Sequence, residues 1–307
     1  MTAAVVFAYH NVGVRCLRVL LARGVRVGLV VTHADNPREN IWFGSVAGVA
    51  AEQRIPCITP EDPNAPDVVA RIAALQPDFL FSFYYRLMLK APLLAIPRAG
   101  ALNMHGSLLP RYHGRVPVNW AIIHGETATG ATLHYMTEKP DNGDIVGQTA
   151  VPILPDDTAA EVFDKVTVAA ELTLYHALPG LVAGTAPRIR QDLRQGGYFG
   201  GRKPEDGRID WSLPAVRIHN LVRAVAPPYP GAFCEAGGGR LVVRRSRVAD
   251  AAAPIAAAPG LRVADGRLVA DCGAGTLEIL DCTLDDVPFD AAAFAARFGA
   301  HLPLPAG

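Results

Sequence analysis

The N-terminal stretch AAVVFAYHNVGVRCLRVLLARGVRVGLVVT, residues 3–32, decides the fold. Residues 3–9 form an apolar run of strand length, and residues 13–24 carry apolar side chains at helical spacing. Gly24 stands where a helix commonly ends on glycine, and residues 25–32 form a second apolar run. The stretch therefore predicts a strand, a helix and a strand, in that order.

The same alternation continues over the next fifty residues. Helical patterns occupy residues 44–54 and 67–76, and strand-like runs occupy residues 56–59 and 78–83. Such an order predicts a Rossmann-like α/β domain, with a mostly parallel sheet that helices cover on both faces. The first turn holds one glycine and no GxGxxG fingerprint, so this topology does not imply a dinucleotide.

The second half of the chain changes character. A long helix is expected from about Ala159 to Gly184, starting with a capping box between Thr158 and Glu161. Short strand-like pieces follow further on, and Asp265-Gly266 is a hairpin signal between two of them. This pattern predicts a small β-rich, OB-like barrel domain. We therefore expect a catalytic domain at 1–189, a linker rich in glycine and charge at 190–207, and the barrel-like domain at 208–307.

Composition restricts the function classes. The 307 residues include 29 basic and 29 acidic side chains, and this zero net charge disfavours a protein whose main partner is nucleic acid. The five cysteines are scattered and form no CxxC pair, so no metal site is expected. The N-terminus lacks the pattern of a signal peptide, and no run of 18 apolar residues suggests a membrane span. A cytoplasmic protein is the prediction.

Residues 101–120, ALNMHGSLLPRYHGRVPVNW, concentrate polar groups after a strand-like lead-in. Side chains alternate along a strand, so Asn103 and His105 should project together from its carboxyl end. An amide and an imidazole suit an oxygen that gains negative charge, and the imidazole also exchanges protons near neutral pH. The alternative is that both are satisfied polar residues at a strand end.

Two further polar elements lie near this stretch. Asp141 stands in a tight turn, PDNG, which either directs its carboxylate towards His105 or only caps the turn itself. If the turn meets the end of the strand, the carboxylate would orient the imidazole and support its charged form. Arg111 and Arg115 precede a helix start, where guanidinium groups favour phosphate; a solvated turn is the alternative for both.

Taken together, residues 102–136 and the following PDNGDIVGQ resemble the folate-dependent formyltransferases. The match rests on Asn-x-His, an Asp in a D-x-G loop, and the flanking HGSLLPRYHGR, and the resemblance extends over almost the whole chain. It implies that Asn103, His105 and Asp141 are catalytic and that N10-formyltetrahydrofolate is the co-substrate. It implies no metal.

Within that family the chain looks most similar to one branch. Its members formylate UDP-4-amino-4-deoxy-L-arabinose in the aminoarabinose modification of lipid A, which confers polymyxin resistance. The best-known members carry a further decarboxylase domain, and this chain corresponds to the formyltransferase half. Methionyl-tRNA formyltransferase is the alternative, but its Gly- and Lys-rich loop after the second strand is replaced here by residues 32–45, which contain Arg38 and no lysine.

The resemblance also implies binding residues. The folate would lie along the segment after the fourth strand and against the catalytic carboxylate, at Tyr85, Arg86, Leu87, Met88, Leu89 and Asp141. The UDP pyrophosphate would meet Arg115, Arg202 and Lys203. The expected partner is a small nucleotide sugar, with no nucleic acid or membrane, and an oligomer is compatible with it.

Two other functions remain open at this stage. Formyltetrahydrofolate hydrolases share the Asn-His-Asp core and use water as the acceptor. Ser107 beside His105 suggests a serine nucleophile, but it follows a strand-end glycine and stands in no G-x-S-x-G elbow. A non-enzymatic folate- or nucleotide-binding regulator would leave all three core residues idle.

Overall fold

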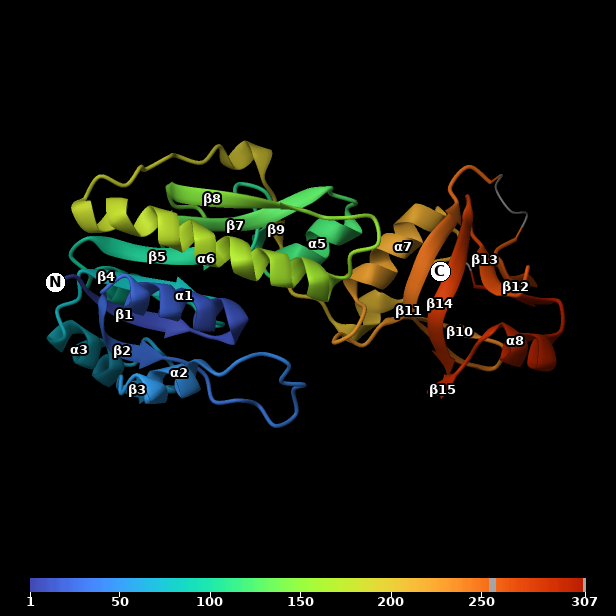
Figure 1. Ribbon diagram of the computed structural model, residues 1–307, viewed down its shortest axis with the longest axis horizontal. Coiled ribbons are helices and arrows are strands. Elements are labelled where there is room, and N and C mark those ends of the chain that lie inside the picture. The colour runs from blue at the N-terminus through green and yellow to red at the C-terminus, as the bar shows by residue number, and fades with distance from the viewer. Residues whose placement is uncertain (254–257, 306–307) are drawn as a thin grey trace. The chain divides into compact units, whose positions relative to one another are not determined.

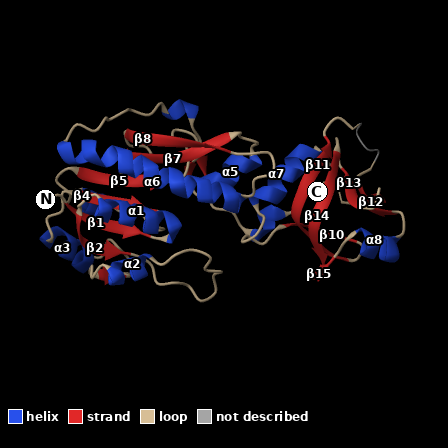
Figure 2. Cartoon of the chain, in the orientation of Figure 1, coloured by secondary structure: helices blue, strands red, loops and turns tan. Residues whose placement is uncertain are grey.

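A computed structural model describes residues 1–253 and 258–305 (Figures 1 and 2). The chain forms two compact units. Three segments build each of them: residues 1–117, 128–152 and 163–200 in unit 1, and residues 118–127, 153–162 and 201–307 in unit 2. The domain boundaries at 189 and 208 stay predictions.

Unit 1 is built on a seven-stranded sheet with the order β3-β2-β1-β4-β5-β7-β8. The strands are β1 (Ala3–Ala8), β2 (Arg26–Val31), β3 (Cys57–Ile58), β4 (Phe79–Phe83), β5 (Gly100–His105), β7 (Ala128–Tyr135) and β8 (Ile145–Pro152). The pairs from β3 to β5 are parallel, whereas β7 and β8 are added antiparallel. The predicted mostly parallel α/β domain is therefore confirmed. Two short strands, β6 (His113–Gly114) and β9 (Tyr198–Phe199), pair separately.

The helices of this part of the chain follow the strands in alternation. They are α1 (His10–Ala22), α2 (Val46–Glu52), α3 (Pro66–Ala74), α4 (Ala91–Leu94), α5 (Pro117–Ile123) and α6 (Ala159–Ala183), with a 3-10 turn at Leu193–Gln195. Every residue of β1 is buried, as expected for a central strand covered on both faces. Val5 and Phe7 pack with Val68 and Ile72 of α3 in one cluster. Figure 1 shows α1 and α6 side by side, where Arg15 pairs with Glu171.

Strand order fixes where a ligand can enter. β1 lies between β2 and β4, so the sheet grows from β1 towards β2 and β3 on one side and towards β4 and β5 on the other. Ligands of open α/β sheets bind beside such a switch point, at the carboxyl ends of the strands. The carboxyl ends of β1, β4 and β5 are neighbours, because the three strands are parallel and adjacent. The polar residues at the end of β5 therefore face the favoured position for a site.

Helix α6 begins with the predicted capping box. The Thr158 N–H donates to Glu161 at 2.7 Å, and the Glu161 N–H donates back to the Thr158 hydroxyl at 3.4 Å. By length and composition α6 could cross a membrane, with a mean hydropathy of 1.3, but 44% of that window is buried inside the structure. Val166 and Leu174 are fully buried, so one face of α6 belongs to the core, whereas Val168, Leu172 and Val182 are exposed.

Unit 2 is built on an antiparallel sheet with the order β10-β11-β14-β13-β12-β16, and β15 pairs with β14. Its elements are a 3-10 turn (Pro204–Gly207), α7 (Ala215–Ala224), β10 (Ala232–Ala236), β11 (Gly239–Asp250), β12 (Gly260–Ala264), β13 (Arg267–Asp271), β14 (Thr276–Leu284), β15 (Val287–Pro288), α8 (Ala291–Phe298) and β16 (His301–Pro303). Trp211, Ile218, Leu277 and Phe294 share its core cluster. The predicted β-rich domain is confirmed as a curled sheet; between the described strands no pairing joins β10 to β16 and closes it.

The hairpin between β12 and β13 turns at the predicted dipeptide. Asp265 has φ +50° and Gly266 has φ +73°, the left-handed conformations that a two-residue hairpin turn needs. Asp and Gly tolerate this region better than most residues, so the turn chemistry sets the register of the two strands.

Candidate active site

A cavity of about 560 Å³ opens in unit 1 where β4 and β5 end. Its walls come from the segment after β4, the end of β5, the loop before α5 and the turn after β7. The lining residues are Ser82, Tyr84, Tyr85, Arg86, Leu87, Met88, Leu89, Asn103, Met104, His105, Gly106, Gly114, Arg115, Val116, Pro117, His134, Met136, Thr137, Pro140, Asp141 and Tyr198. The cavity thus holds all three residues that the sequence predicts to be catalytic.

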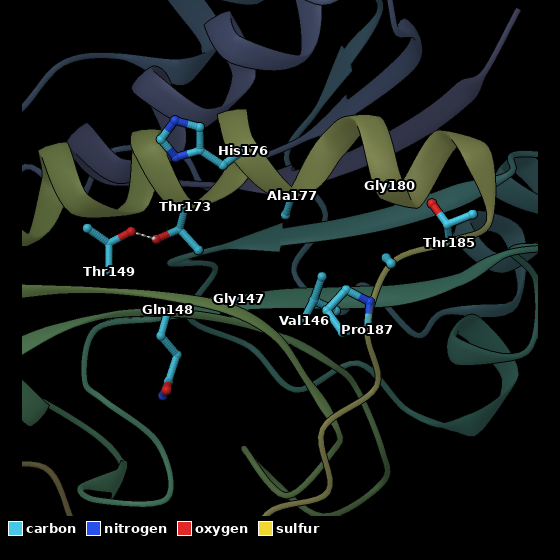
Figure 3. Close-up of a pocket in the computed structure, with 11 residues that line it drawn as sticks. Val146, Gly147, Gln148, Thr149, Thr173, His176, Ala177, Gly180, Thr185 and Pro187 are labelled. Carbon is cyan, nitrogen blue, oxygen red and sulfur yellow. Dashed lines mark hydrogen bonds between the residues drawn. The ribbon is translucent and has the colours of Figure 1, made fainter.

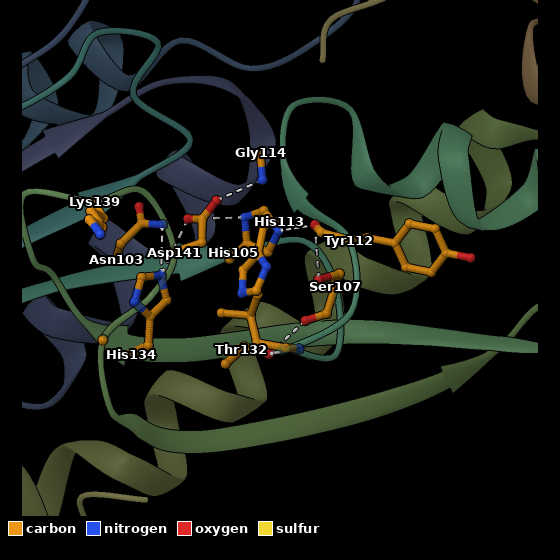
Figure 4. A network of polar contacts seen from close by, with 12 residues as sticks. Asn103, His105, Ser107, Tyr112, His113, Gly114, Thr132, His134, Lys139 and Asp141 are labelled. Atoms are coloured by element: carbon orange, nitrogen blue, oxygen red, sulfur yellow. Dashed lines mark hydrogen bonds and ion pairs between the residues drawn. The ribbon is translucent and has the colours of Figure 1, made fainter. Parts of the chain in front are cut away.

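Asn103 and His105 project from the same face of β5, as strand alternation predicts (Figure 4). The antiparallel neighbour β7 places His134 directly opposite Asn103. The Asn103 side-chain nitrogen lies 3.2 Å from Nε2 of His134. His134 is 1% exposed, so the amide and the imidazole form a fixed pair.

His105 is held at both ring nitrogens. Nε2 lies 2.7 Å from the carbonyl oxygen of Tyr112, which can only accept, so Nε2 carries a proton. Nδ1 faces Oδ1 of Asp141 at 3.5 Å. Burial lowers the pKa of His105, while Asp141 and the Tyr112 carbonyl act in the opposite direction without overcoming it. The ring is therefore neutral near pH 7 and presents Nδ1 as a proton acceptor beside a carboxylate.

Asp141 lies in the turn between β7 and β8, with φ +56°. Oδ2 accepts the Gly114 N–H at 2.9 Å, and Oδ1 also lies 3.6 Å from Nε2 of His134. Burial alone would raise the pKa of this carboxyl, but the nearby His105 ring and the Gly114 N–H outweigh it and hold the pKa well below its usual range. Asp141 is thus an ionised carboxylate in a largely buried position.

The loop between β5 and α5 is fixed by hydroxyl and amide groups. Ser107 is fully buried, and its hydroxyl donates to the Arg111 carbonyl at 2.6 Å. Thr132 donates to the Ser107 carbonyl at 2.6 Å, and Gln148 donates to the Leu109 carbonyl at 2.8 Å. A serine that closes its own turn is a structural residue, which argues against a serine nucleophile here.

Comparison with known protein families decides the identity. Residues 18–178 match the family model described as formyl transferase, and residues 202–299 match the model of the formyl transferase C-terminal domain. The chain belongs to the formyl transferase family. The resemblance to the family and the predicted enzyme class, a formyltransferase, are therefore confirmed, and the resemblance to one branch stays a prediction.

Solved structures with the same fold come from several bacteria. An N-formyltransferase from Helicobacter canadensis, in complex with folinic acid and dTDP-3-aminofucose, matches with a TM-score of 0.71 and 19% identity over 91% of this chain and 99% of that one. WlaRD, a sugar 3N-formyl transferase with dTDP and 5-N-formyl-THF, matches with a TM-score of 0.70 and 17% identity over 91% and 97%. HypX from Aquifex aeolicus, in complex with tetrahydrofolic acid, matches with a TM-score of 0.61 and 18% identity over 97% of this chain and 47% of that one.

All residues that this formyltransferase is predicted to use for folate line the cavity. The segment 85–89 is anchored because Asn64 donates to the Met88 carbonyl at 3.0 Å and accepts from the Lys90 N–H at 2.8 Å. Leu87 and Met88 are 40% and 50% exposed, and such apolar side chains can cover a flat ring. Their roles in binding stay predictions.

Arg86 of this group already has a partner. Its guanidinium meets the Glu39 carboxylate at 2.8 and 2.9 Å and lies 4.7 Å from the ring centre of Tyr9. The Arg86 N–H also donates to Nε2 of His33 at 3.0 Å. Arg86 therefore ties the loop after β2 to the segment after β4, and both its guanidinium and its backbone N–H are engaged in these contacts.

The residues predicted for the pyrophosphate fall in different parts of the formyltransferase. Arg115 lines the cavity with an exposed side chain, and its backbone N–H donates to the Phe199 carbonyl at 2.9 Å. Arg202 and Lys203 belong to unit 2, and neither lines this cavity. Arg202 donates to the Asp206 carbonyl at 2.7 Å. Their contact with a nucleotide stays a prediction.

A second cleft is smaller and lies beside β8 and α6 (Figure 3). Thr149 and Thr173 bond to each other at 2.7 Å across it, and His176 stands at its exposed rim. Its lining residues include no carboxylate, so it lacks the imidazole–carboxylate pair of the larger cavity. Within residues 1–253 and 258–305, no group of three or more His, Cys, Asp and Glu side chains could hold a metal ion.

Sequence reasoning missed two polar residues of the site. His134 is visible in the sequence as a histidine in an apolar strand, but its position opposite Asn103 depends on the β5–β7 pairing. Gln191 lies fifty residues after the Asp141 turn and donates to it. Only a signal for long-range pairing would have found either residue.

Proposed function

We propose that the protein transfers a formyl group from N10-formyltetrahydrofolate to the amino group of a nucleotide-linked amino sugar. One observation carries this proposal: Asn103 and His105 from β5 and Asp141 from the turn after β7 line one cavity, with Nδ1 of His105 3.5 Å from the carboxylate. An amide donor, a neutral imidazole and an ionised carboxylate are the groups that formyl transfer to an amine requires. The solved relatives that hold folates and a dTDP-amino sugar support the class of both substrates.

The cavity fits the donor chemically. Its walls combine the apolar side chains of Leu87 and Met88 with the polar side chains of Asn103, His105 and Asp141, which suits a flat heterocycle with a polar edge. When bound, the folate supplies the formyl group. Asn103 directs one N–H to His134 and lines the cavity, so its second N–H can donate to the formyl oxygen as that oxygen gains charge.

Proton movement is assigned to His105 and Asp141. The attacking amine must be neutral and must lose a proton once its bond to the formyl carbon forms. Nδ1 of His105 takes this proton beside Oδ1 of Asp141, which faces the same nitrogen at 3.5 Å, and an imidazolium–carboxylate pair forms. The same proton then passes to the folate nitrogen as its bond to the formyl carbon breaks, so no net charge is left in the cavity.

The finer substrate we propose is UDP-4-amino-4-deoxy-L-arabinose, as in the aminoarabinose modification of lipid A. Its support is the sequence resemblance to that branch, together with residues 32–45, which lack the lysines of the tRNA-binding loop. Arg115 is the candidate for the pyrophosphate, because its exposed side chain stands at the cavity wall. The enzyme would act in the cytoplasm on a small molecule and without a metal.

A single assay tests both levels of the proposal. Purified protein and N10-formyltetrahydrofolate are incubated with UDP-4-amino-4-deoxy-L-arabinose, a dTDP-3-amino sugar, methionyl-tRNA or no acceptor, and products are identified by mass spectrometry. We expect a formamido sugar from the UDP substrate. A formylated dTDP sugar alone would support the proposed sugar formyltransferase activity but contradict UDP-4-amino-4-deoxy-L-arabinose as the substrate. Formyl-methionyl-tRNA would contradict the sugar formyltransferase activity and identify a methionyl-tRNA formyltransferase. Formate without an acceptor would identify a hydrolase.

A further inference from the structure

Residues 190–199, referred to here as the 190–199 segment, run past the Asp141 turn. Gln191 is 9% exposed and directs its side-chain amide into this turn. Nε2 donates to the Asp141 carbonyl at 2.7 Å and to the Gly143 carbonyl at 2.7 Å. Both N–H groups of one amide are therefore used on two carbonyls of the turn that carries the catalytic carboxylate.

The same side chain reaches the opposite wall of the site. Oε1 of Gln191 lies 3.3 Å from Nε2 of His113, in the loop before α5. That loop provides the Gly114 N–H, which donates to Oδ2 of Asp141 at 2.9 Å. Gln191 thus contacts both the backbone of Asp141 and the residue next to its hydrogen-bond donor.

The rest of the 190–199 segment binds that loop through its backbone. The His113 N–H donates to the Gly197 carbonyl, and the Arg115 N–H donates to the Phe199 carbonyl, each at 2.9 Å. These bonds form the parallel β6–β9 pair. A short piece of chain after α6 therefore fixes the two loops between which Asp141 stands.

We propose that Gln191 is a positioning residue for formyl transfer, which holds the Asp141 carboxylate against His105 by bonding to the carbonyls of its turn. The inference rests on the proposed function of Asp141. Asp141 adopts φ +56°, in the left-handed region that few non-glycine residues occupy, and the two bonds from Gln191 stabilise the turn that holds it there. A residue in this place must donate twice, and Gln supplies two N–H groups at the required length.

Two isosteric substitutions separate positioning from packing. Gln191→Met keeps the volume and removes all polar contacts, while Gln191→Glu keeps the length and replaces the amide donors with an acceptor facing two carbonyls. Gln195→Met is the matched control, because exposed Gln195 lies in the same segment and its side chain donates to Asp192, not to the Asp141 turn, at 3.2 Å. For Met and Glu we expect kcat to fall about 10- to 100-fold with KM for both substrates little changed, as for a misplaced catalytic group.

A second readout does not depend on turnover. Retreat of the carboxylate removes its raising effect on His105, so the pKa of His105, followed by NMR of the imidazole, should drop in both Gln191 variants and stay unchanged in Gln195→Met. Wild-type kcat together with a wild-type His105 pKa in Gln191→Met would overturn the proposal. A loss of activity that is proportional to the loss of folded protein in the Gln191 variants would also overturn it. Asp141→Asn, assayed in parallel, tests the proposed function itself, because full activity in this variant would contradict the catalytic role of Asp141. The NMR measurement on the Gln191 variants would still show whether Gln191 positions the Asp141 carboxylate.

Discussion

The side-chain nitrogen of Asn103 lies 3.2 Å from Nε2 of His134, its opposite partner in the antiparallel β5–β7 pair. Nδ1 of His134 lies 2.9 Å from the Tyr135 carbonyl oxygen, which requires a proton on Nδ1. Nε2 is then the acceptor, and Asn103 points its nitrogen rather than its oxygen towards it. The orientation of the amide, on which formyl-oxygen stabilisation depends, is therefore set by a residue that touches no substrate atom in the proposed mechanism.

Replacing Asn103 with Ala should lower kcat by about 100- to 1000-fold, the usual cost of losing one donor to a developing oxyanion. The dissociation constant of the folate, measured by fluorescence titration, should change little, because the donor acts mainly in the transition state. Asn36→Ala, in an exposed turn, is the control and should behave as wild type. An Asn103→Ala variant that loses binding and turnover in equal proportion would indicate a binding role instead.

Substitutions at His134 should separate its role as an acceptor from its volume. Gln can accept the Asn103 N–H through its side-chain oxygen, whereas Phe fills the space and leaves that donor without a partner, at a cost of about 1–3 kcal/mol in the free energy of unfolding. We expect kcat to fall clearly more for His134→Phe than for His134→Gln, as measured with saturating substrates. Equal values for the two variants would show that the hydrogen bond does not matter for turnover.

Much of unit 1 follows from local sequence. Residues 3–32 predict β1, α1 and β2 in their observed order, and Gly24, which the pattern marks as the end of the helix, has φ +76°. The faces of Asn103 and His105 follow from strand alternation alone. These features depend on neighbours within a few residues, so the local sequence is enough to predict them.

The remaining geometry depends on contacts that are distant in sequence. The local sequence predicts that Asp141 stands in a turn, but not where this turn lies relative to His105. Oδ1 of Asp141 comes to 3.5 Å from Nδ1 of His105 because β7 pairs antiparallel with β5. His134 and Gln191 reach the site through the same long-range packing. In the barrel-like domain, whether the first and last strands of the curled sheet pair is also a long-range property, which short strand patterns do not specify.

Asp141→Asn should change how stability depends on pH. The pKa of Asp141 is lower in the folded protein than its unfolded value of about 3.9, so its charge stabilises the fold above that pH, and the contribution is lost as the pH falls through the folded pKa. Asn has no such titration. Urea unfolding should therefore show wild type more stable than Asp141→Asn at pH 7, with a smaller difference at pH 3. An unchanged difference would mean that the carboxylate is not stabilised in its ionised form.

Gly143 permits a close approach that fixes the same turn. A Cβ at this position would collide with the carbonyl oxygen of Tyr135, a backbone atom of β7 that cannot move independently. We expect Gly143→Ala to lower the free energy of unfolding by about 1–3 kcal/mol, as overpacking does, and to reduce kcat as well, because the displaced turn carries Asp141 away from His105.

The control for this variant is Gly28→Ala, where the added methyl would meet Leu75 side-chain atoms at 3.8 Å and the Ala4 carbonyl oxygen at 4.0 Å, which are ordinary contacts. Urea unfolding and kcat measured on both proteins separate the two effects of the clash. If Gly143→Ala lost stability but kept wild-type kcat in the folded fraction, the turn would absorb the methyl without moving the carboxylate. The reaction would then depend much less on the position of Asp141 than we infer from its contacts with His105, Gly114 and Gln191.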